Sequence, residues 1–355
     1  MTLSQSLPVT KPLPVGEIIL SKYKITNIVH SGCFGSVYRA FNCVSGRDIA
    51  LKQIQIGSPD EFSRILESIA QCMCEHRNVV KFYSGDIFPY DGCTYLIIEM
   101  EYIPQGSLAD RINREFVPVS DSVRYIKDVL FAVQHANVHG VIHRDIKPGN
   151  IMLSAPQAKL SDFGVAYYNP AAMEVVRNSF YRPHASPEAI VLGQFDQQSD
   201  VFCAGMALFA AVNNYSGISS LVGHSMSSRQ FWSDVESGSL VDSIGFKAYI
   251  PNRLKQIIKT ACHSDLEKRY FSASLFRDAL ERLTFDNDWT PVNSEMTEWT
   301  SRLKHRNAIS IDKSRDYRVV FLKNGRKIAR YCSAHYTEKL ALQEVYKLVR
   351  ETTLV

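Results

Sequence analysis

The sequence predicts an α+β protein with two lobes, followed by a small basic module. Short apolar runs rich in β-type residues occur over residues 23–101, whereas residues 117–283 carry mostly helical patterns. An Asn-Gly pair between two alternating runs near the C-terminal end indicates a further hairpin. The chain has 355 residues, of which 45% are hydrophobic, so it can form two or three units without disulfides.

The first lobe is predicted as a β-rich unit over residues 21–103. Residues 1–20 contain three prolines and no periodicity, so we expect a flexible leader there. The elements expected next are strands at 23–30, 36–41 and 48–54, a helix at 59–74, and strands at 79–84 and 94–101. The stretch IPQGS at 103–107 breaks this pattern and is expected to act as a hinge.

The second lobe is predicted as a helical unit over residues 104–285. Apolar residues recur at helical spacing, for example over 121–135 and 199–213. A β-rich half followed by a helical half suggests a cleft between the two, and such clefts are common ligand sites.

A linker is predicted at 286–293, and a small α-β-β-β-α module at 294–355. Its expected elements are a helix at 294–304, strands at 308–311, 317–323 and 327–331, and a helix at 337–350. In this order the module resembles a double-stranded RNA-binding domain, and its strands followed by a helix are similar to small AP2-type DNA-binding modules.

The predicted module is strongly basic. Residues 302–355 hold 13 Lys and Arg against 5 Asp and Glu, whereas the whole chain carries a net charge of only +4. One interpretation is nucleic-acid binding through the cations around the hairpin, Lys323, Arg326, Lys327 and Arg330. The other is a solvated basic face on a module that docks onto the helical lobe or onto a protein substrate.

The cysteines, the first residues and the apolar runs of the sequence indicate the compartment in which we expect the protein. The eight cysteines form no CxxC pair, so free thiols in a reducing compartment are the simplest interpretation. The first residues lack the basic start and apolar core of a signal peptide. The longest apolar run, near 204–212, is too short to cross a bilayer. We therefore expect a cytoplasmic protein without a membrane segment, and the oligomeric state stays open.

A glycine-containing loop is the first candidate for a nucleotide site. The stretch HSGCFGSV at 30–37 follows the pattern G-x-G-x-x-G-x-V, except that His30 replaces the first glycine. Gly32 and Gly35 remain where the backbone must approach phosphates closely. Lys52 in IALK can reach a nucleotide under this loop and needs an anchoring carboxylate such as Glu67. As an isolated pair, these two residues would more often be solvated surface charges.

Two further stretches supply the polar groups that phosphoryl transfer requires. VIHRDIKPGNIML at 141–153 contains Asp145, Lys147 and Asn150, and LSDFGVA contains Asp162. A carboxylate can orient a hydroxyl and accept its proton, and a lysine can neutralise the transferring phosphoryl group. Amide and carboxylate oxygens, together with phosphates, are ligands that Mg²⁺ prefers.

In order and spacing, these motifs resemble the eukaryotic-like, or Hanks-type, protein kinase family over residues 23–283. The later stretches SPEAI, SDVFCAG and DLEKRY agree and include Glu188, Asp200 and Arg269. The residues within these motifs are most similar to those of soluble bacterial serine/threonine kinases. The resemblance implies the bilobal protein kinase fold and transfer of the γ-phosphate of Mg-ATP to Ser and Thr hydroxyls of proteins, including autophosphorylation.

The resemblance also implies a role for each matching residue. Asp145 would be the catalytic base, Lys147 would contact the γ-phosphate, and Asn150 and Asp162 would hold Mg²⁺ or Mn²⁺. Lys147 is the residue type found in Ser/Thr rather than Tyr kinases. The residues expected around ATP are Ser31, Gly32, Gly35, Val37, Ala50, Lys52, Glu67, Met100, Glu101, Ile103 and Met152.

Alternative functions and the mode of regulation stay open in the sequence. A pseudokinase or scaffold would bind nucleotide without transfer, and a nucleic-acid-associated regulator would act through the basic module. For regulation, Arg144 is expected to face an activation loop over 165–185, in which Ser179 is the candidate phosphosite. Gln71 stands where the family has an apolar residue near Phe163.

Overall fold

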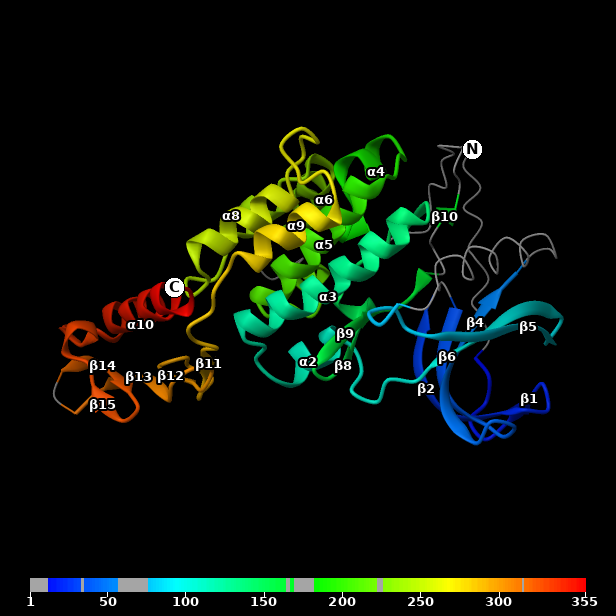
Figure 1. Cartoon of the computed structure of the whole chain (residues 1–355), viewed down its shortest axis with the longest axis horizontal. Helices are drawn as coiled ribbons and strands as arrows, with labels where there is room; N and C mark the ends of the chain where they lie inside the picture. Colours follow the sequence, from blue (N-terminus) through cyan, green and yellow to red (C-terminus); the bar gives the residue numbers. More distant parts are fainter. Residues whose placement is uncertain are drawn as a thin grey trace. The chain divides into compact units, whose positions relative to one another are not determined.

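The computed structural model describes residues 12–32, 35–56, 76–163, 167–168, 182–221, 226–314 and 316–355. The chain divides into two compact units, Met1–Gln105 and Gly106–Val355 (Figure 1). The division falls inside the stretch 103–107 that the sequence predicts as a hinge. The predicted helix at 59–74, with Glu67 and Gln71, lies outside the described residues.

The first unit is built on an antiparallel sheet. Its strands are β1 (Ile18–Ile19), β2 (Tyr23–Gly32), β3 (Gly35–Asn42), β4 (Arg47–Gln55), β5 (Phe82–Tyr90) and β6 (Cys93–Glu101). They lie in the order β1-β2-β3-β4-β6-β5. Strands β2, β3, β4 and β6 form where the sequence predicts them, whereas β5 begins and ends later than expected.

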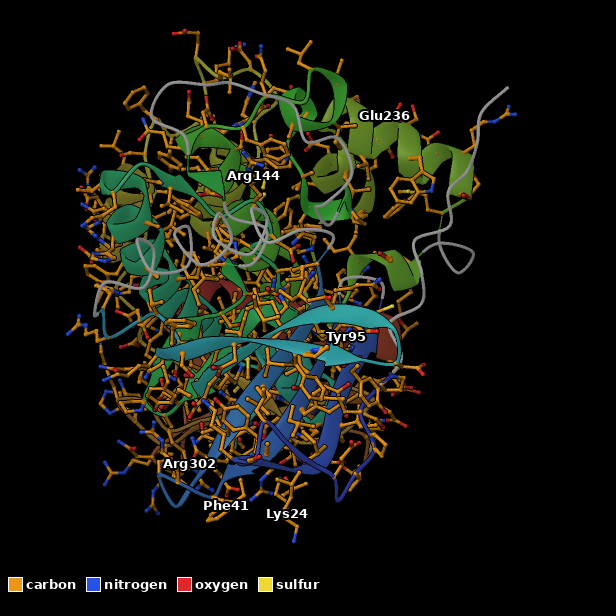
Figure 2. The ribbon with its side chains drawn as sticks, turned by 90° about the vertical axis from the view of Figure 1, so that its right-hand side faces the viewer. Lys24, Phe41, Tyr95, Arg144, Glu236 and Arg302 are labelled. Carbon is orange, nitrogen blue, oxygen red and sulfur yellow. The ribbon has the colours of Figure 1, made fainter. Side chains whose placement is uncertain are left out.

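The two faces of this sheet differ in what they bury. One face carries an apolar core that includes Tyr38, Ala40, Ile49, Leu51, Tyr95 and Ile97, and Figure 2 labels Tyr95 on this sheet. Successive residues of a strand point to opposite faces, so the alternate positions lie on the other side. There Val37, Lys52 and Ile98 stand side by side in register. The predicted nucleotide contacts of β3, β4 and β6 therefore share the face opposite this core.

Residues 12–20 belong to the fold, although the sequence predicts a flexible leader over 1–20. Leu13 is fully buried, and its backbone N–H donates to the Tyr38 hydroxyl over 2.9 Å. The Gly16 N–H donates to the Ile25 carbonyl oxygen over 2.8 Å and helps to align β1 with β2. The predicted flexible leader is therefore wrong for residues 12–20. The prolines remove any periodic pattern from this segment, but they do not prevent it from packing against the sheet.

The second unit begins as a helical assembly. Its helices are α2 (Leu108–Arg114), α3 (Val119–Val138), α4 (Pro187–Val191), α5 (Gln197–Val212), α6 (Ser228–Ser237), α7 (Leu240–Ile244), α8 (Asn252–Ala261) and α9 (Ala273–Glu281). Helix α5 is buried on all sides, as its nearly uninterrupted apolar sequence requires, and α3, α8 and α9 pack around it (Figure 1). Asp196 and Ser199 fix its start with a capping box.

The C-terminal module is a sheet covered by one helix. Its strands are β11 (Thr290–Pro291), β12 (Glu298–Ser301), β13 (Asn307–Asp312), β14 (Tyr317–Lys323), β15 (Arg326–Lys327) and β16 (Ser333–His335), and its helix is α10 (Glu338–Thr353). Asn324 and Gly325 both have positive φ, 51° and 78°, and form the predicted hairpin turn between β14 and β15. Helix α10 covers β13 and β14 with its apolar stripe.

Two predictions within the module are wrong. The segment 294–304 is not a helix but a turn followed by β12. The Asn293 side chain bonds the backbone N–H and the hydroxyl of Thr297, and Met296 has a left-handed φ of 54°, which ends any helix there. The strand expected at 327–331 is also mostly absent, since Ala329–Tyr331 forms a 3-10 helix. The α-β-β-β-α order, and with it the likeness to a double-stranded RNA-binding domain, is lost.

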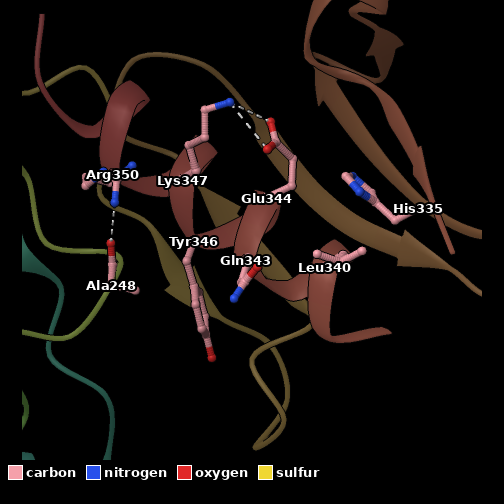
Figure 3. Close-up of a pocket in the computed structure, with 8 residues that line it drawn as sticks. All are labelled: Ala248, His335, Leu340, Gln343, Glu344, Tyr346, Lys347 and Arg350. Carbon is pink, nitrogen blue, oxygen red and sulfur yellow. Dashed lines mark hydrogen bonds and ion pairs between the residues drawn. The ribbon is translucent and has the colours of Figure 1, made fainter. Parts of the chain in front are cut away.

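The module shares a core with the helical part of its unit. Trp299 of β12 is fully buried, with ring centroids 5.6 Å from Phe116 and 5.3 Å from Tyr249 of the helical part. Tyr346 of α10 completes this aromatic cluster, 6.4 Å from Trp299. Arg350 of α10 donates to the Ala248 carbonyl oxygen over 3.4 Å (Figure 3). The module is therefore packed against the helices rather than merely tethered to them.

The segment predicted as a linker, 286–293, carries part of this packing. Asn287 and Trp289 are buried, with 1% and 3% exposure. The Asn287 amide donates to the Thr352 carbonyl oxygen over 2.7 Å, and the Trp289 indole donates to the Thr352 hydroxyl over 3.0 Å. In the described ranges, no helix combines the length and apolar character needed to cross a membrane.

Candidate functional site

The glycine loop lies at the turn between β2 and β3. Gly32 pairs with Gly35 at the turn, and His30 pairs with Val37 two pairs earlier. Gly35 has a φ of 118°, and a Cβ atom there would lie 2.0 Å from the Gln53 carbonyl oxygen. The backbone of β4 therefore excludes any side chain at Gly35. His30 is exposed at the strand end, where no comparable contact excludes its side chain.

The other nucleotide contacts expected in the first unit follow from the sheet register. Lys52 is 8% exposed and lies between Val37 and Ile98. Ala50 stands opposite Met100 two residues along the same face. The structure thus brings these four predicted residues, Val37, Ala50, Lys52 and Met100, onto one patch of the sheet. The backbone at Ser31 and Gly32 ends β2 beside it.

At the C-terminal end of β6 lie the two residues expected to contact the edge of the base through their backbone. The Glu101 N–H donates to the Lys81 carbonyl oxygen over 2.8 Å. Ile103 is 5% exposed. The hydrogen bond at Glu101 fixes the backbone where the strand leaves the sheet.

In the second unit, Asp145, Lys147 and Asn150 form one hydrogen-bonded group. They lie between β7 (Val141–Ile142) and β8 (Ile151–Ser154), with Asn150 in a 3-10 turn. The Lys147 ammonium donates to Asp145 Oδ2 over 2.7 Å, and the Asn150 amide donates to the same oxygen over 2.9 Å. The Asn150 amide also donates to the Asp145 carbonyl oxygen over 2.7 Å. The three residues predicted to be catalytic are therefore held together by local bonds.

The second carboxylate oxygen of Asp145 is available for a ligand. The side chain is 7% exposed. Its Oδ1 atom is buried and accepts no hydrogen bond from any residue that the structure describes. A buried carboxylate oxygen without a donor is costly, and active sites are a common place for one.

The carboxylate of Asp200, on α5, holds the backbone of the loop that carries Asp145. Its carboxylate accepts hydrogen bonds from the backbone N–H groups of His143 and Arg144, both over 2.9 Å, and from the Asn137 amide over 3.2 Å. Burial raises the pKa of Asp200, while His143 and the backbone donors act in the opposite direction. These bonds hold Arg144 at its left-handed φ of 70°. Asn137 was not predicted, since no local pattern marks it.

His143 connects this loop to Asp162. Its Nε2 atom lies 3.0 Å from the Ser161 carbonyl oxygen, and its ring meets the Phe163 ring edge-on at 4.6 Å. The Ser161 N–H donates to the Asn150 carbonyl oxygen over 2.9 Å. The backbone next to Asp162 is therefore tied to both ends of the loop that carries Asp145.

Met152 follows the catalytic loop on β8 and is partly buried. It forms an isolated antiparallel bridge with Ser107, the N-cap residue of α2. This bridge anchors the strand on which Met152 lies.

Glu188 and Arg269, which the matching motifs single out, form an ion pair. Two guanidinium nitrogens of Arg269 donate to the two carboxylate oxygens of Glu188 over 2.7 and 3.0 Å. Burial disfavours the Glu188 carboxylate, but the arginine prevails and lowers its pKa. Arg269 also donates to the carbonyl oxygens of His263 and Gln198. The pair thus connects α4, the start of α5 and the loop before α9.

The residues of the site fit a divalent metal and a nucleotide. Asn150 and Asp162 provide an amide oxygen and a carboxylate, the hard ligands that Mg²⁺ and Mn²⁺ take together with phosphates. The unpartnered Asp145 Oδ1 is a suitable acceptor for a hydroxyl group. Ser179 and nearly all of the predicted activation loop lie outside the described residues.

Comparison with known proteins agrees with these features. The protein kinase domain model matches residues 23–280. Serine/threonine-protein kinase 1 of Arabidopsis thaliana is 34% identical over 194 residues, covering 53% of this chain and 23% of that protein. Probable serine/threonine-protein kinase PknB of Lactococcus lactis is 24% identical over 296 residues, covering 78% and 46%. PrkC of Bacillus subtilis is 28% identical over 204 residues, covering 55% and 31%.

The chain spans less than half the length of each of these three relatives. The family match nevertheless covers well over half of the chain and includes both the sheet and the Asp145 loop. The chain therefore belongs to the protein kinase domain family.

Proposed function

We propose that the chain is a serine/threonine protein kinase, which transfers the γ-phosphate of ATP to Ser and Thr hydroxyls of proteins, its own included. The observation that carries this proposal is the hydrogen bonding of the two Asp145 carboxylate oxygens. Lys147 and Asn150 hold its Oδ2 atom, and its buried Oδ1 atom has no donor among the described residues. This arrangement leaves one acceptor oriented toward a substrate hydroxyl.

Asp145 would position the hydroxyl of the protein substrate. Its Oδ1 atom accepts the hydroxyl proton as the oxygen attacks the γ-phosphorus, which orients a lone pair for in-line transfer. Lys147 already reaches Asp145 Oδ2 and can extend its ammonium toward the γ-phosphate. A cation there stabilises the negative charge that develops on the phosphoryl oxygens.

Asn150 and Asp162 would hold the divalent metal. A divalent metal held by these residues would supply charge neutralisation to the phosphates. The Asn150 side-chain amide donates its hydrogens to Asp145. These bonds fix the direction in which the Asn150 Oδ1 atom points. The Ser161 N–H donates to the Asn150 carbonyl oxygen, which holds the backbone before Asp162 next to Asn150.

The first unit would bind the nucleotide itself. The backbone at Ser31, Gly32 and Gly35 would cover the phosphates, and Lys52, anchored by Glu67, would contact the α- and β-phosphates. The apolar side chains of Val37 and Ala50 would contact the adenine beside Met100, and the family resemblance assigns Met152, in the second unit, to the same base. Backbone groups at Glu101 and Ile103 would bond its edge.

Lys147 and the relatives both favour serine and threonine over tyrosine as the residues that receive the phosphate. The relatives carry serine/threonine kinase names, and Lys147 matches the residue type of that class. Gly149 stands where many kinases have an acidic residue that selects basic substrates, so we propose no preference for basic sites.

The decisive experiment is the substitution Asp145→Asn. We expect it to lower phosphate transfer from Mg-ATP to a generic protein by about 100-fold or more, since a general base contributes that much. Nucleotide binding should stay close to that of the unaltered chain. The matched control is Asp265→Asn on an exposed loop, which should leave transfer unchanged.

Three outcomes would count against the proposal. Normal nucleotide binding without any transfer by the unaltered chain would make it a scaffold. Phosphotyrosine as the product would contradict the Ser/Thr assignment. Full transfer by the Asp145→Asn variant would show that another group serves as the base.

A further inference from the structure

The cations of the C-terminal module are divided into paired and unpaired ones. Five of its described cations lie within ion-pair distance of a carboxylate, and seven do not, Lys327, Arg330 and Lys339 among them. The pairs include Lys313 with Glu338 at 2.6 Å, Arg318 with Asp316 at 3.2 Å, and Lys347 with Glu344 at 3.2 Å. By contrast, no carboxylate of the described residues forms an ion pair with Arg302, Arg306, Lys323 or Arg326.

These four unpaired cations meet at one end of the sheet, which we call the basic end. The register aligns Ser301 with Asn307, Asn307 with Lys323, and Lys323 with Arg326. Arg302 and Arg306 lie immediately beyond the first two of these positions. The four charges therefore come from two connections at the same end of the sheet, β12–β13 with Arg302 and Arg306, and β14–β15 with Lys323 and Arg326.

Two backbone-directed bonds hold the basic end together. The Asn324 N–H donates to the Arg306 carbonyl oxygen over 2.7 Å, and the Arg306 N–H donates to Asn324 Oδ1 over 2.9 Å. Arg302 is anchored by its own N–H, which donates to Asp288 Oδ1 over 2.9 Å. The backbone is thus fixed while the guanidinium groups extend from it.

The basic end borders a hollow of about 350 Å³. Its floor is made by Thr300, Ala308 and Leu322, which lie in register across β12, β13 and β14. Arg302 and Arg306 stand at its rim. None of the residues lining this hollow is an aromatic anchor of the kind that dominates protein–protein interfaces.

A second hollow of the same unit lacks these properties. It has a volume of about 420 Å³ and lies beside α10, where Lys347 bonds Glu344 and Arg350 bonds the Ala248 carbonyl oxygen (Figure 3). Its cations are already engaged by the protein. Positive charge without a protein partner is thus a feature of the basic end and not of every hollow on the module.

We propose that the basic end binds the phosphate backbone of a nucleic acid, with Arg302, Arg306, Lys323 and Arg326 each facing a phosphate. Repeated phosphates match four separate cations better than a single anion does, and such contacts use Arg, Lys and hydroxyl side chains. The hollow between the cations offers the Thr300 hydroxyl. This function is independent of phosphate transfer by the kinase domain.

Salt dependence of binding tests the proposal on the full chain. The probe is a fluorescent 20-base-pair DNA duplex of arbitrary sequence, followed by anisotropy. Four phosphate contacts predict a slope of about −3.6 for log K against log salt, or roughly a 100-fold loss of affinity between 50 and 200 mM. Replacing all four cations by Gln should remove most of this slope, and each single replacement should reduce it by about 1.

The control variant removes the same charge elsewhere on the module, through Lys313→Gln, Arg318→Gln, Lys339→Gln and Lys347→Gln. It should keep the slope, because three of these cations are paired within the protein. Equal weakening of both variants would show mere attraction by net charge and overturn the proposal. Tighter binding of a polyglutamate peptide than of the duplex would assign the basic end to an acidic protein instead. If the fourfold variant misfolds, R302Q and R326Q alone still measure the slope.

Discussion

At the scale of single residues, Gly35 shows why a glycine is required in the nucleotide loop. Its φ of 118° disfavours every other residue, and the Gln53 carbonyl oxygen occupies the place of a Cβ atom. The usual explanation for glycines in such a loop is close approach to phosphate. At this position, packing between β3 and β4 imposes the same requirement without any ligand.

The substitution Gly35→Ala should therefore destabilise the fold as well as weaken ATP binding. We expect the free energy of unfolding to fall by about 2–4 kcal/mol, because strain and a steric clash add. Chemical denaturation measures this loss, and an ATP titration measures the binding.

Gly46→Ala is the matched control. Gly46 also has a positive φ, 67°, but nothing lies within 4 Å of an added Cβ atom. Its cost should stay near 1 kcal/mol, since only the backbone conformation is disfavoured. Equal losses at both glycines would show that contact with Gln53 contributes nothing.

Individual residues also mark the limits of prediction from sequence. The grouping of Asp145, Lys147 and Asn150 was predictable because their bonds are local and the motif is compact. Asn137 was not, because its amide reaches Asp200 63 positions away and no neighbouring residue signals this contact. His30, where the pattern has a glycine, lies near the end of β2 and is exposed there.

At the scale of elements, the Glu188–Arg269 pair connects α4 with the loop before α9. Both side chains are largely buried, with 11% and 0% exposure. Removing one partner of a buried pair leaves an uncompensated charge, which costs far more than losing an exposed pair.

The substitution Glu188→Gln should lower the free energy of unfolding by about 3–5 kcal/mol at neutral pH. The folded-state pKa of Glu188 lies below its ordinary value of 4.5, so the ionised form is stabilised by folding. This contribution is complete above pH 4.5 and disappears as the pH falls through the lower folded-state pKa. Unfolding curves should therefore converge for the two proteins in acid.

Asp242→Asn is the control for this element. Asp242 is 67% exposed and pairs with Lys259 at the surface, so its loss should cost less than about 1 kcal/mol. A gap between the unaltered chain and the Glu188→Gln variant that stays constant with pH would contradict the electrostatic explanation.

Elements differ in how far their sequence determines them. Strands β2, β3, β4 and β6 and helices α3 and α5 were predictable from periodicity. The segment 294–304 was not, because its conformation depends on side-chain bonds from Asn293 and on a left-handed Met296. Trp299 also fixes the position of β12 through contacts with Phe116 and Tyr249, which are distant in the sequence.

At the scale of the whole molecule, the C-terminal module is part of the helical unit's core. The aromatic cluster of Phe116, Tyr249, Trp299 and Tyr346 joins residues from both. Deletion of the module would uncover Phe116 and Tyr249, so the module cannot be removed without consequence for the helices beneath it.

The substitution Trp299→Ala should cost about 3–5 kcal/mol and loosen the module. Limited proteolysis should then cut within 286–293, where the backbone is held by the module in the unaltered chain. Trp232→Ala, at a position 39% exposed, is the matched control and should be cleaved no faster than the unaltered chain. Unchanged proteolysis of the Trp299→Ala variant would show that other contacts suffice.

The bond from Asn287 to Thr352 also sets an order of events during synthesis. The two residues are separated by 65 positions, so a growing chain exposes Asn287 and Trp289 long before their partner exists. At 5–20 residues per second, this interval lasts about 3 to 13 seconds. The sheet of the module can form early, but its closure against α10 waits for translation to pass Thr352. Chaperones that recognise exposed aromatic side chains would meet the nascent protein in this interval.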